Sequence, residues 1–205
     1  ERDKRISNAR ELAVAELYGS RGLSGVVALL KTGKAHSAVG HALILVIEQG
    51  KEAEIVTGLL AWPDVDMAPA IDSCLLSFIH RADTEVRNSL LGDASRSDDD
   101  ALRLFLAAPF DRSTWEAIER ERPQISLNYW KKVALQPWHL ESSDVSYMID
   151  RALGAGRPLG AFQAVASIAK KVDPTDLTRV LRAIPTAQID EAEVVQIDPW
   201  RIGEA

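Results

Sequence analysis

Residues 39–47, VGHALILVI, and residues 71–79, IDSCLLSFI, decide the fold. In both stretches apolar side chains recur at positions i, i+3, i+4, i+7 and i+8, which is the spacing of one face of an α-helix. The first set consists of Val39, Ala42, Leu43, Val46 and Ile47, and the second of Ile71, Cys74, Leu75, Phe78 and Ile79. The same spacing recurs at residues 145–153 and 177–184, and no stretch alternates apolar and polar residues as a half-buried strand would. The sequence therefore predicts an all-α fold.

Residues that favour helix starts and helix ends stand between these stripes. Asp173 precedes Pro174, so a capping side chain is followed by a proline at the first helical position, where its missing N–H costs nothing. Ser97 is followed by three aspartates, which suit the positive end of a helix dipole. Capping-box spacing is found twice, at Asn8 with Glu11 and at Ser113 with Glu116. Left-handed helix ends are expected at the glycines that follow apolar stripes, namely Gly19, Gly33, Gly50, Gly92 and Gly156.

The helical stripes group into successive pairs joined by short connections. We expect about twelve helices, paired within residues 8–32, 36–61, 66–92, 97–122, 125–155 and 157–184. Each pair takes roughly 25–35 residues, which is near the periods of helical repeats. This predicts a right-handed α-solenoid of stacked antiparallel helix pairs, forming a single α-helical repeat domain over residues 1–205. A compact helical bundle with the same helices is the alternative.

Two turns of the chain share one pattern. Leu30-x-x-Gly33-Lys34-x-x-x-Ala38 is matched by Leu153-x-x-Gly156-Arg157-x-x-x-Ala161. In both turns we expect the cation, Lys34 or Arg157, to neutralise the carbonyls of the helix that has just ended, and the alanine to allow close packing. The pattern resembles the turn between the helices of tetratricopeptide-like repeats, although the Trp, Tyr and Pro of a full tetratricopeptide repeat are absent.

Residues 98–184 carry a second resemblance. The sequences LRLFLAAPFDRSTWEAIERERP, YWKKV and DVSYMIDRALGAGRPLGAF resemble helical-repeat regions, tetratricopeptide- or HEAT-like, of very large bacterial multidomain proteins. Some of those proteins are linked to anti-phage defence. The resemblance implies an α-helical repeat segment that follows other domains, and it assigns no catalytic or ligand-binding residue. A first residue other than Met, Glu1, and a helical pattern that continues towards Ala205 lead us to expect a piece of a longer chain.

The composition argues against several classes of protein. The 205 residues include 24 basic and 30 acidic side chains, a net charge of −6, which argues against sequence-independent binding to nucleic acid or anionic lipid. The longest apolar run, residues 42–47, is far shorter than the roughly 20 residues of a membrane-spanning helix. A single cysteine, Cys74, excludes an intramolecular disulfide and agrees with a reducing compartment. We therefore expect a cytoplasmic protein without a membrane segment.

Residues suited to catalysis or metal binding are few and poorly spaced. His36 and His41 lie five positions apart, about 140° around a helix, so they do not form a metal-binding pair. Cys74 lies on an apolar stripe, which favours a buried and inert thiol. The aromatic and basic cluster at residues 129–132 offers rings that could stack on bases, but neighbouring glutamates and the apolar face shared by Trp130 favour a core position. We therefore expect no enzyme activity, no metal and no cofactor.

Three of the five tryptophans adjoin a proline, at Trp62, Trp138 and Trp200. If these turns follow one edge of a helix stack, their indoles form a ledge for a peptide or a partner subunit. In the alternative interpretation each indole fills a gap between successive pairs. The predicted function is a non-catalytic interaction scaffold that binds a protein, a peptide or other domains of the same chain, and the alternative is an all-α enzyme or ligand-binding bundle. The residues expected to bind the partner are these three tryptophans with Lys34, His36 and Arg157.

Overall fold

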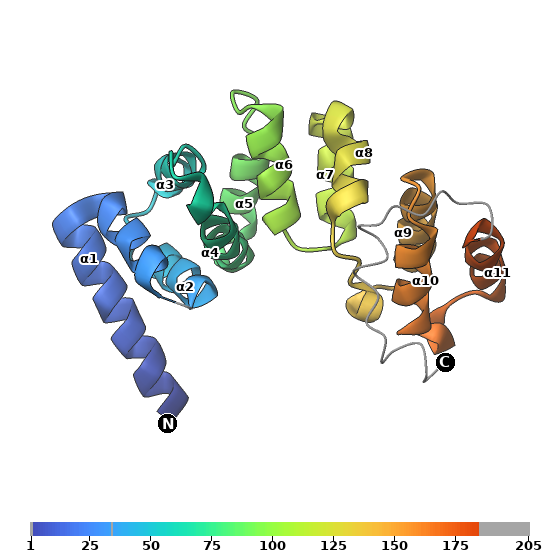
Figure 1. The fold of residues 1–205 in the computed structure, drawn as a ribbon, viewed down its shortest axis with the longest axis horizontal. Helices are drawn as coiled ribbons and strands as arrows, with labels where there is room; N and C mark the ends of the chain where they lie inside the picture. Colours follow the sequence, from blue (N-terminus) through green and yellow to red (C-terminus); the bar gives the residue numbers. More distant parts are fainter. Residues whose placement is uncertain (1, 34, 185–205) are drawn as a thin grey trace. The chain divides into compact units, whose positions relative to one another are not determined.

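The computed structural model of the chain describes residues 2–33 and 35–184 (Figure 1). Within these ranges it contains eleven α-helices, three short 3-10 helices and no strand, which confirms the all-α prediction. The chain divides into two compact units, Glu1–Pro109 and Phe110–Ala205, called unit 1 and unit 2 below. Each unit has its own packing, and the single repeat domain over the whole chain stays a prediction.

Unit 1 contains six α-helices and one 3-10 helix, drawn from blue to green in Figure 1. They are α1 (Arg2–Thr32), α2 (His36–Val46), α3 (Glu52–Leu60), η1 (Val65–Met67), α4 (Ala68–Arg81), α5 (Thr84–Leu91) and α6 (Asp98–Ala107). α1 is kinked at Gly22, whose φ of 58° lies in the left-handed region, so this helix consists of two stretches. The predicted pair at residues 8–32 corresponds to these two stretches. With α1 counted as two, the eleven helices give twelve helical segments in the described ranges, as predicted.

Unit 2 contains five α-helices and two 3-10 helices. They are α7 (Arg112–Glu121), α8 (Pro123–Lys132), η2 (Pro137–His139), α9 (Ser142–Gly154), α10 (Pro158–Ala166), η3 (Ala169–Lys171) and α11 (Pro174–Ala183). α7 packs against α8 and α8 against α9, while α9, α10 and α11 all pack against one another. The second helices of the last two predicted pairs, α9 and α11, are therefore in direct contact.

Helix starts follow the predicted capping residues in two cases and differ in two. Asp173 accepts a hydrogen bond of 2.7 Å from a backbone N–H in the first turn of α11, and this bond lowers the pKa of its carboxyl. Ser97 accepts one of 3.1 Å at the start of α6. Both capping-box predictions are wrong. The capping residue of α7 is Asp111, two positions before Ser113, and α1 begins at Arg2, so that Asn8 lies inside it.

The glycines expected to end helices divide in the same way. Gly156 has the predicted left-handed backbone just after α9, with a φ of 76°, whereas Gly50, with a φ of 89°, is left-handed but lies in a turn three residues after the C-cap of α2, Ile47. The prediction is wrong for the other three, Gly19, Gly33 and Gly92. Gly19 continues α1, and Gly92 ends α5 with a φ of −83°, because a helix can also end through backbone angles that any residue adopts.

The packing of alternate helices organises unit 1. α2 packs against α1 and α4, α4 packs in turn against α6, and α3 packs against α5. Figure 1 shows α2 and α4 side by side. The two helices run in the same direction, because Ser37 on α2 contacts Ser73 on α4 (Oγ to Oγ 3.0 Å) and the residues one turn further along each helix, His41 and Ser77, line one pocket. The first helices of successive predicted pairs therefore stack on one another.

α2 and α4 come into backbone contact at Gly40. A Cβ on this glycine would lie 2.0 Å from the backbone oxygen of Cys74 and 2.8 Å from its carbonyl carbon, so only a residue without a side chain fits. The apolar side chains beside the contact, Leu43, Leu75 and Phe78, are fully buried. The close approach thus joins the two stripes, residues 39–47 and 71–79, in one core.

Aromatic rings fill the core of unit 2 around Trp115, which is fully buried. Its ring centroid lies 4.9 Å from that of Phe110, 5.4 Å from that of Trp130 and 5.6 Å from that of Tyr147. The Tyr147 ring is stacked on the indole, and the guanidinium of Arg112 lies over the Tyr147 ring at 3.8 Å. Such ring pairs and cation–π contacts stabilise the core beyond the burial of apolar area.

Gly40→Ala is expected to destabilise unit 1 by about 2–3 kcal/mol, because the added methyl group forces α2 away from α4 and loosens the shared core. The matched control is Gly19→Ala, since a Cβ on Gly19 meets nothing within 4 Å and alanine favours a helix by up to about 1 kcal/mol. Urea unfolding of both variants measures the difference. Equal unfolding midpoints would contradict the backbone contact.

Candidate functional site

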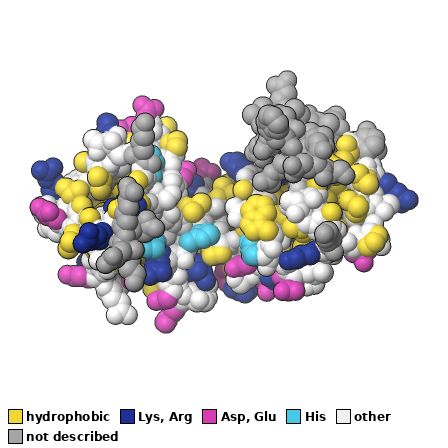
Figure 2. Space-filling model, turned by 90° about the horizontal axis from the view of Figure 1, so that it is seen from below, with side chains coloured by type: hydrophobic (Ala, Val, Ile, Leu, Met, Phe, Trp, Pro, Cys, Tyr) yellow, Lys and Arg dark blue, Asp and Glu magenta, His cyan; other side chains and the backbone are white. Residues whose placement is uncertain are grey.

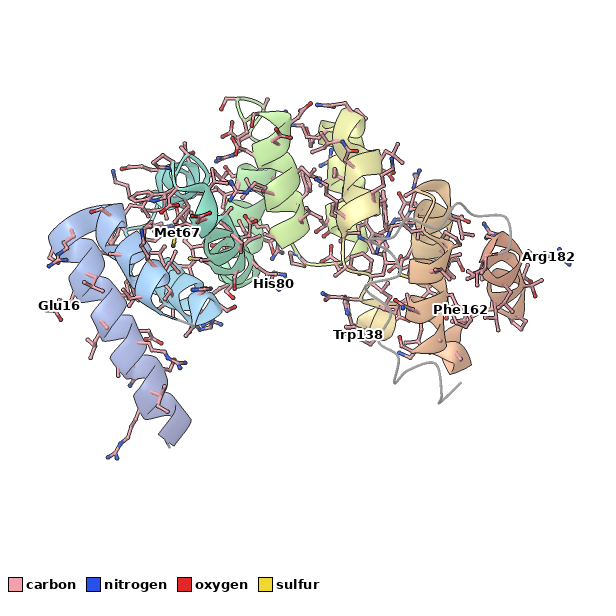
Figure 3. All side chains as sticks on the ribbon, in the orientation of Figure 1. Glu16, Met67, His80, Trp138, Phe162 and Arg182 are labelled. Atoms are coloured by element: carbon pink, nitrogen blue, oxygen red, sulfur yellow. The ribbon has the colours of Figure 1, made fainter. Side chains whose placement is uncertain are left out.

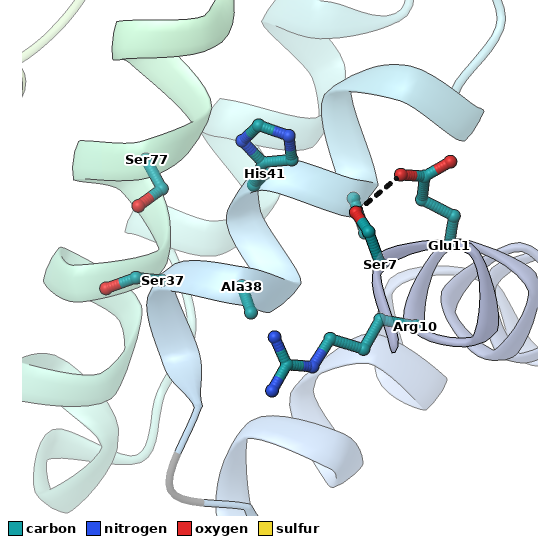
Figure 4. A pocket seen from close by; sticks show the side chains of 8 residues that line it. Ser7, Arg10, Glu11, Ser37, Ala38, His41 and Ser77 are labelled. Atoms are coloured by element: carbon teal, nitrogen blue, oxygen red, sulfur yellow. Dashed lines mark hydrogen bonds between the residues drawn. The ribbon is translucent and has the colours of Figure 1, made fainter. Parts of the chain in front are cut away.

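A pocket in unit 1 gathers polar side chains from three helices, α1, α2 and α4 (Figure 4). Its volume is about 290 Å³. We call it the α1–α2–α4 pocket, and it is lined by Ser7, Arg10, Glu11, Ser37, Ala38, His41, Ala42 and Ser77. The spacing of these residues follows the helical period, because residues three or four positions apart lie on the same helix face. The parallel stacking of α2 on α4 then brings their polar positions to the same wall.

Several polar groups of the pocket have no protein partner. The Ser7 hydroxyl donates to Glu11 Oε1 at 3.1 Å, and Ser37 and Ser73 share a hydrogen bond. Arg10, His41 and Ser77 make no hydrogen bond or ion pair within residues 2–33 and 35–184. Figure 4 shows the Arg10 guanidinium reaching towards α2 beside Ala38, while the Glu11 carboxylate turns to Ser7. Arg10 therefore offers only hydrogen-bond donors and a permanent positive charge, whereas the Ser77 hydroxyl and the His41 ring can each donate or accept.

The sequence-predicted partner-binding residues are divided between the two units. In unit 1, Trp62 is half-buried between α3 and η1, and His36 Nε2 lies 2.9 Å from the backbone oxygen of Gly33 at the start of α2. In unit 2, Trp138 in η2 is 54% exposed (labelled in Figure 3). Lys34 and Trp200 lie outside the described residues. The tryptophan ledge stays a prediction.

Arg157, the remaining predicted residue, is buried in unit 2. One guanidinium nitrogen, Nη1, donates to the backbone oxygens of Trp130 at 3.0 Å and Val133 at 2.7 Å. These carbonyls belong to the C-terminal end of α8. The expectation that Arg157 neutralises the helix that precedes it, α9, is corrected: the cation serves a helix end that lies 24 residues earlier in the chain. A role of Arg157 in partner binding stays a prediction.

The aromatic and basic cluster at residues 129–132 does not form a stacking surface. Tyr129 and Trp130 are 0% and 2% exposed, and both rings belong to the core around Trp115. Burial is also the main cause that raises the pKa of the Tyr129 hydroxyl. The favoured interpretation of this cluster, a core position, is confirmed.

The pocket residues were missed by sequence reasoning, although a signal is present. On α2, Ser37 and His41 are four positions apart, and on α4, Ser73 and Ser77 are also four apart, 36 residues further along. This repeat of polar positions on two apolar helices marks one partly exposed row that continues from helix to helix. Arg10 carries no comparable signal.

Comparisons with known proteins add no relative. No family model matches the chain, and no curated protein or solved structure gives a significant match. In the described ranges, no group of three or more His, Cys, Asp and Glu side chains could hold a metal ion. No helix within those ranges combines the length and apolar character needed to cross a bilayer.

The thiol of Cys74 is expected to resist modification in the folded protein. Burial raises its pKa to about 12, so the reactive thiolate is absent at neutral and mildly alkaline pH. Because this folded-state pKa lies above the ordinary thiol pKa of about 8.5, the free energy of unfolding should fall as the pH rises through that window towards 12. A thiol-reactive chromophore measures the labelling rate with and without denaturant.

Fast labelling of the native protein would show that α2 and α4 do not enclose the thiol. The Gly40→Ala variant provides the internal comparison, because separation of the two helices should speed the labelling of Cys74.

Arg157→Leu is expected to destabilise unit 2 by about 3 kcal/mol, since it leaves two carbonyls at the end of α8 without their charged donor. Arg120→Leu is the control, because Arg120 is exposed and its ion pair with Glu121 contributes about 0–1 kcal/mol. Thermal unfolding followed by tryptophan fluorescence reports on unit 2 through Trp115 and Trp130. Similar losses in both variants would refute the capping role.

Proposed function

We propose that the chain is a non-catalytic protein-interaction segment, built as a helical-repeat scaffold. The observation that carries the proposal is the parallel stacking of α2 on α4, with α6 packed against α4. In helical-repeat proteins equivalent helices of neighbouring repeats pack in this way, and the shared exposed face binds partners. The contacts of α3 with α5 and of α9 with α11 join the second helices of neighbouring pairs within each unit.

The register between α2 and α4 supports a repeat. Ser37 is in contact with Ser73, and His41 lines the same pocket as Ser77, so both pairs are offset by 36 residues. Helical repeats have periods of about 33–47 residues.

The chemistry of the pocket favours binding over catalysis. Nucleophilic catalysis needs a hydroxyl or thiol within hydrogen-bond reach of a base. Within the described residues, His41 makes no hydrogen bond to the pocket serines, and the one thiol of the chain is buried. Three polar groups without a protein partner, one each from α1, α2 and α4, are suited to hold a group that a partner supplies.

The wider setting is proposed on the resemblance of residues 98–184 to helical-repeat regions of large bacterial proteins. On that ground the chain belongs to a cytoplasmic multidomain protein, with a regulatory or defence role, and its partner is a protein, a peptide or another domain of the same polypeptide. Lys34, His36 and the tryptophans at Trp62, Trp138 and Trp200 remain candidates for further contacts.

Site-specific photo-crosslinking tests the proposed function. A benzoylphenylalanine at Ser37, on the exposed face of α2, is expected to capture a defined partner in the cells that express the protein. The same amino acid at Ser89, also exposed and helical but on α5, is the matched control and should capture none. The captured protein is then identified and its direct binding to the purified chain is measured.

Direct binding that is weakened by Gly40→Ala supports the scaffold, because this change disturbs the α2–α4 stack. Adducts that form equally from Ser37 and Ser89, or a captured protein that does not bind the purified chain, would overturn the proposal.

A further inference from the structure

We propose that the α1–α2–α4 pocket binds a carboxylate of an extended partner peptide, together with an apolar side chain two residues away. The inference rests on the proposed function and specifies its ligand. Arg10, His41 and Ser77 supply the donors for the carboxylate, and Leu45 on α2 supplies the apolar contact.

The first feature is the set of unpartnered donors. A guanidinium presents a planar fork of N–H groups that matches the two oxygens of a carboxylate. Arg10 has no acidic partner among the described residues, and its guanidinium reaches into the space between α1 and α2 (Figure 4). The one carboxylate of the lining, Glu11, accepts a hydrogen bond from Ser7 and points away from Arg10. The pocket therefore contains a cation, Arg10, that no carboxylate of the protein pairs with, while the negative charge of Glu11 is directed to Ser7.

The second feature is the size of the pocket. Sites for whole cofactors and drug-sized ligands have volumes of about 300–1,000 Å³. At about 290 Å³ the pocket lies at the lower limit, which suits an acidic side chain or a short stretch of peptide.

The third feature is an exposed apolar residue at the right distance. Leu45 is 45% exposed and follows His41 by one helical turn on the same face of α2. Four helical residues span about 6 Å, and two residues of an extended peptide span about 6.6 Å with both side chains on one face. An extended peptide along α2 therefore places an acidic side chain over His41 and an apolar one over Leu45.

The surroundings agree with a mixed ligand. Leu76, next to Ser77 on α4, is 44% exposed, and Ile6, next to Ser7 on α1, is 40% exposed. Figure 2 shows yellow apolar and cyan histidine side chains close together on the face of unit 1, which lies at the left of that view. Because the whole chain has a net charge of −6, long-range attraction does not favour an acidic peptide, and the contact must be local.

Fluorescence anisotropy tests the inference on the full chain. The probe is a fluorescein-labelled, amidated heptapeptide with glutamate at its third and leucine at its fifth position, and with glycine or serine elsewhere. A second probe exchanges the two residues, since the direction of the peptide along α2 is open. We expect saturable binding of one of them, and about tenfold weaker binding when its glutamate is replaced by glutamine.

Matched variants assign the contact to the pocket. Arg10→Gln should weaken the binding of the acidic probe about tenfold and leave the weak binding of the glutamine probe unchanged. Arg5→Gln removes the same charge from an exposed position of the same helix, about 140° away from Arg10, and should have no effect. Leu45→Ser should weaken both the glutamate and the glutamine probes. Thermal unfolding establishes that the three variants are folded.

Three results would overturn the inference: neither probe binds, Arg10→Gln and Arg5→Gln have equal effects, or inorganic phosphate displaces the probe as well as a glutamate peptide does. The last result would assign the pocket to anions in general. Failure of the inference is distinct from failure of the proposed function, because crosslinking from Ser37 to a partner would then persist in the Arg10→Gln variant.

Discussion

The backbone contact between Gly40 and Cys74 is the constraint on which unit 1 depends. Two parallel helices come together there without a side chain between them, and their apolar stripes close into one core on the buried side. The same contact fixes the register on the exposed side, where Ser37 meets Ser73 and His41 lies near Ser77. The core and the candidate binding face are therefore two consequences of one close approach, and neither can change without the other.

The helices were predictable because helical periodicity is a local property. The stripe at residues 71–79 is buried as expected, the stripe at residues 39–47 is buried up to Leu43 and half-buried at its end, and Asp173 and Ser97 begin their helices. The pocket was not predictable in the same way, because it requires knowing which faces of three helices meet. The repeated Ser37–His41 and Ser73–Ser77 spacing points to that face, whereas the position of Arg10 depends on the path of α1 and leaves no trace in the local sequence.

In unit 2 the contacts of long side chains could not be predicted from the local sequence. The pattern at residues 153–161 correctly associates a cation with exposed helix carbonyls, but Arg157 reaches across to the end of α8 because its side chain spans the distance between packed helices. The burial of the tryptophans likewise depends on how the helices pack. Trp115 and Trp130, which adjoin no proline, fill the core, while the proline-linked Trp138 is largely exposed. Position beside a turn says little about burial until the neighbouring helices are in place.

The left-handed backbone at Gly22 has a consequence for recognition. It lies twelve positions from Arg10, yet it sets the angle at which the first stretch of α1 leaves the second and hence the position of the pocket wall that carries Arg10. The binding of a ligand by Arg10 would therefore depend on the backbone conformation at Gly22. Substitutions at the Gly22 kink would therefore change the affinity for a partner, while every side chain that touches the ligand stays the same.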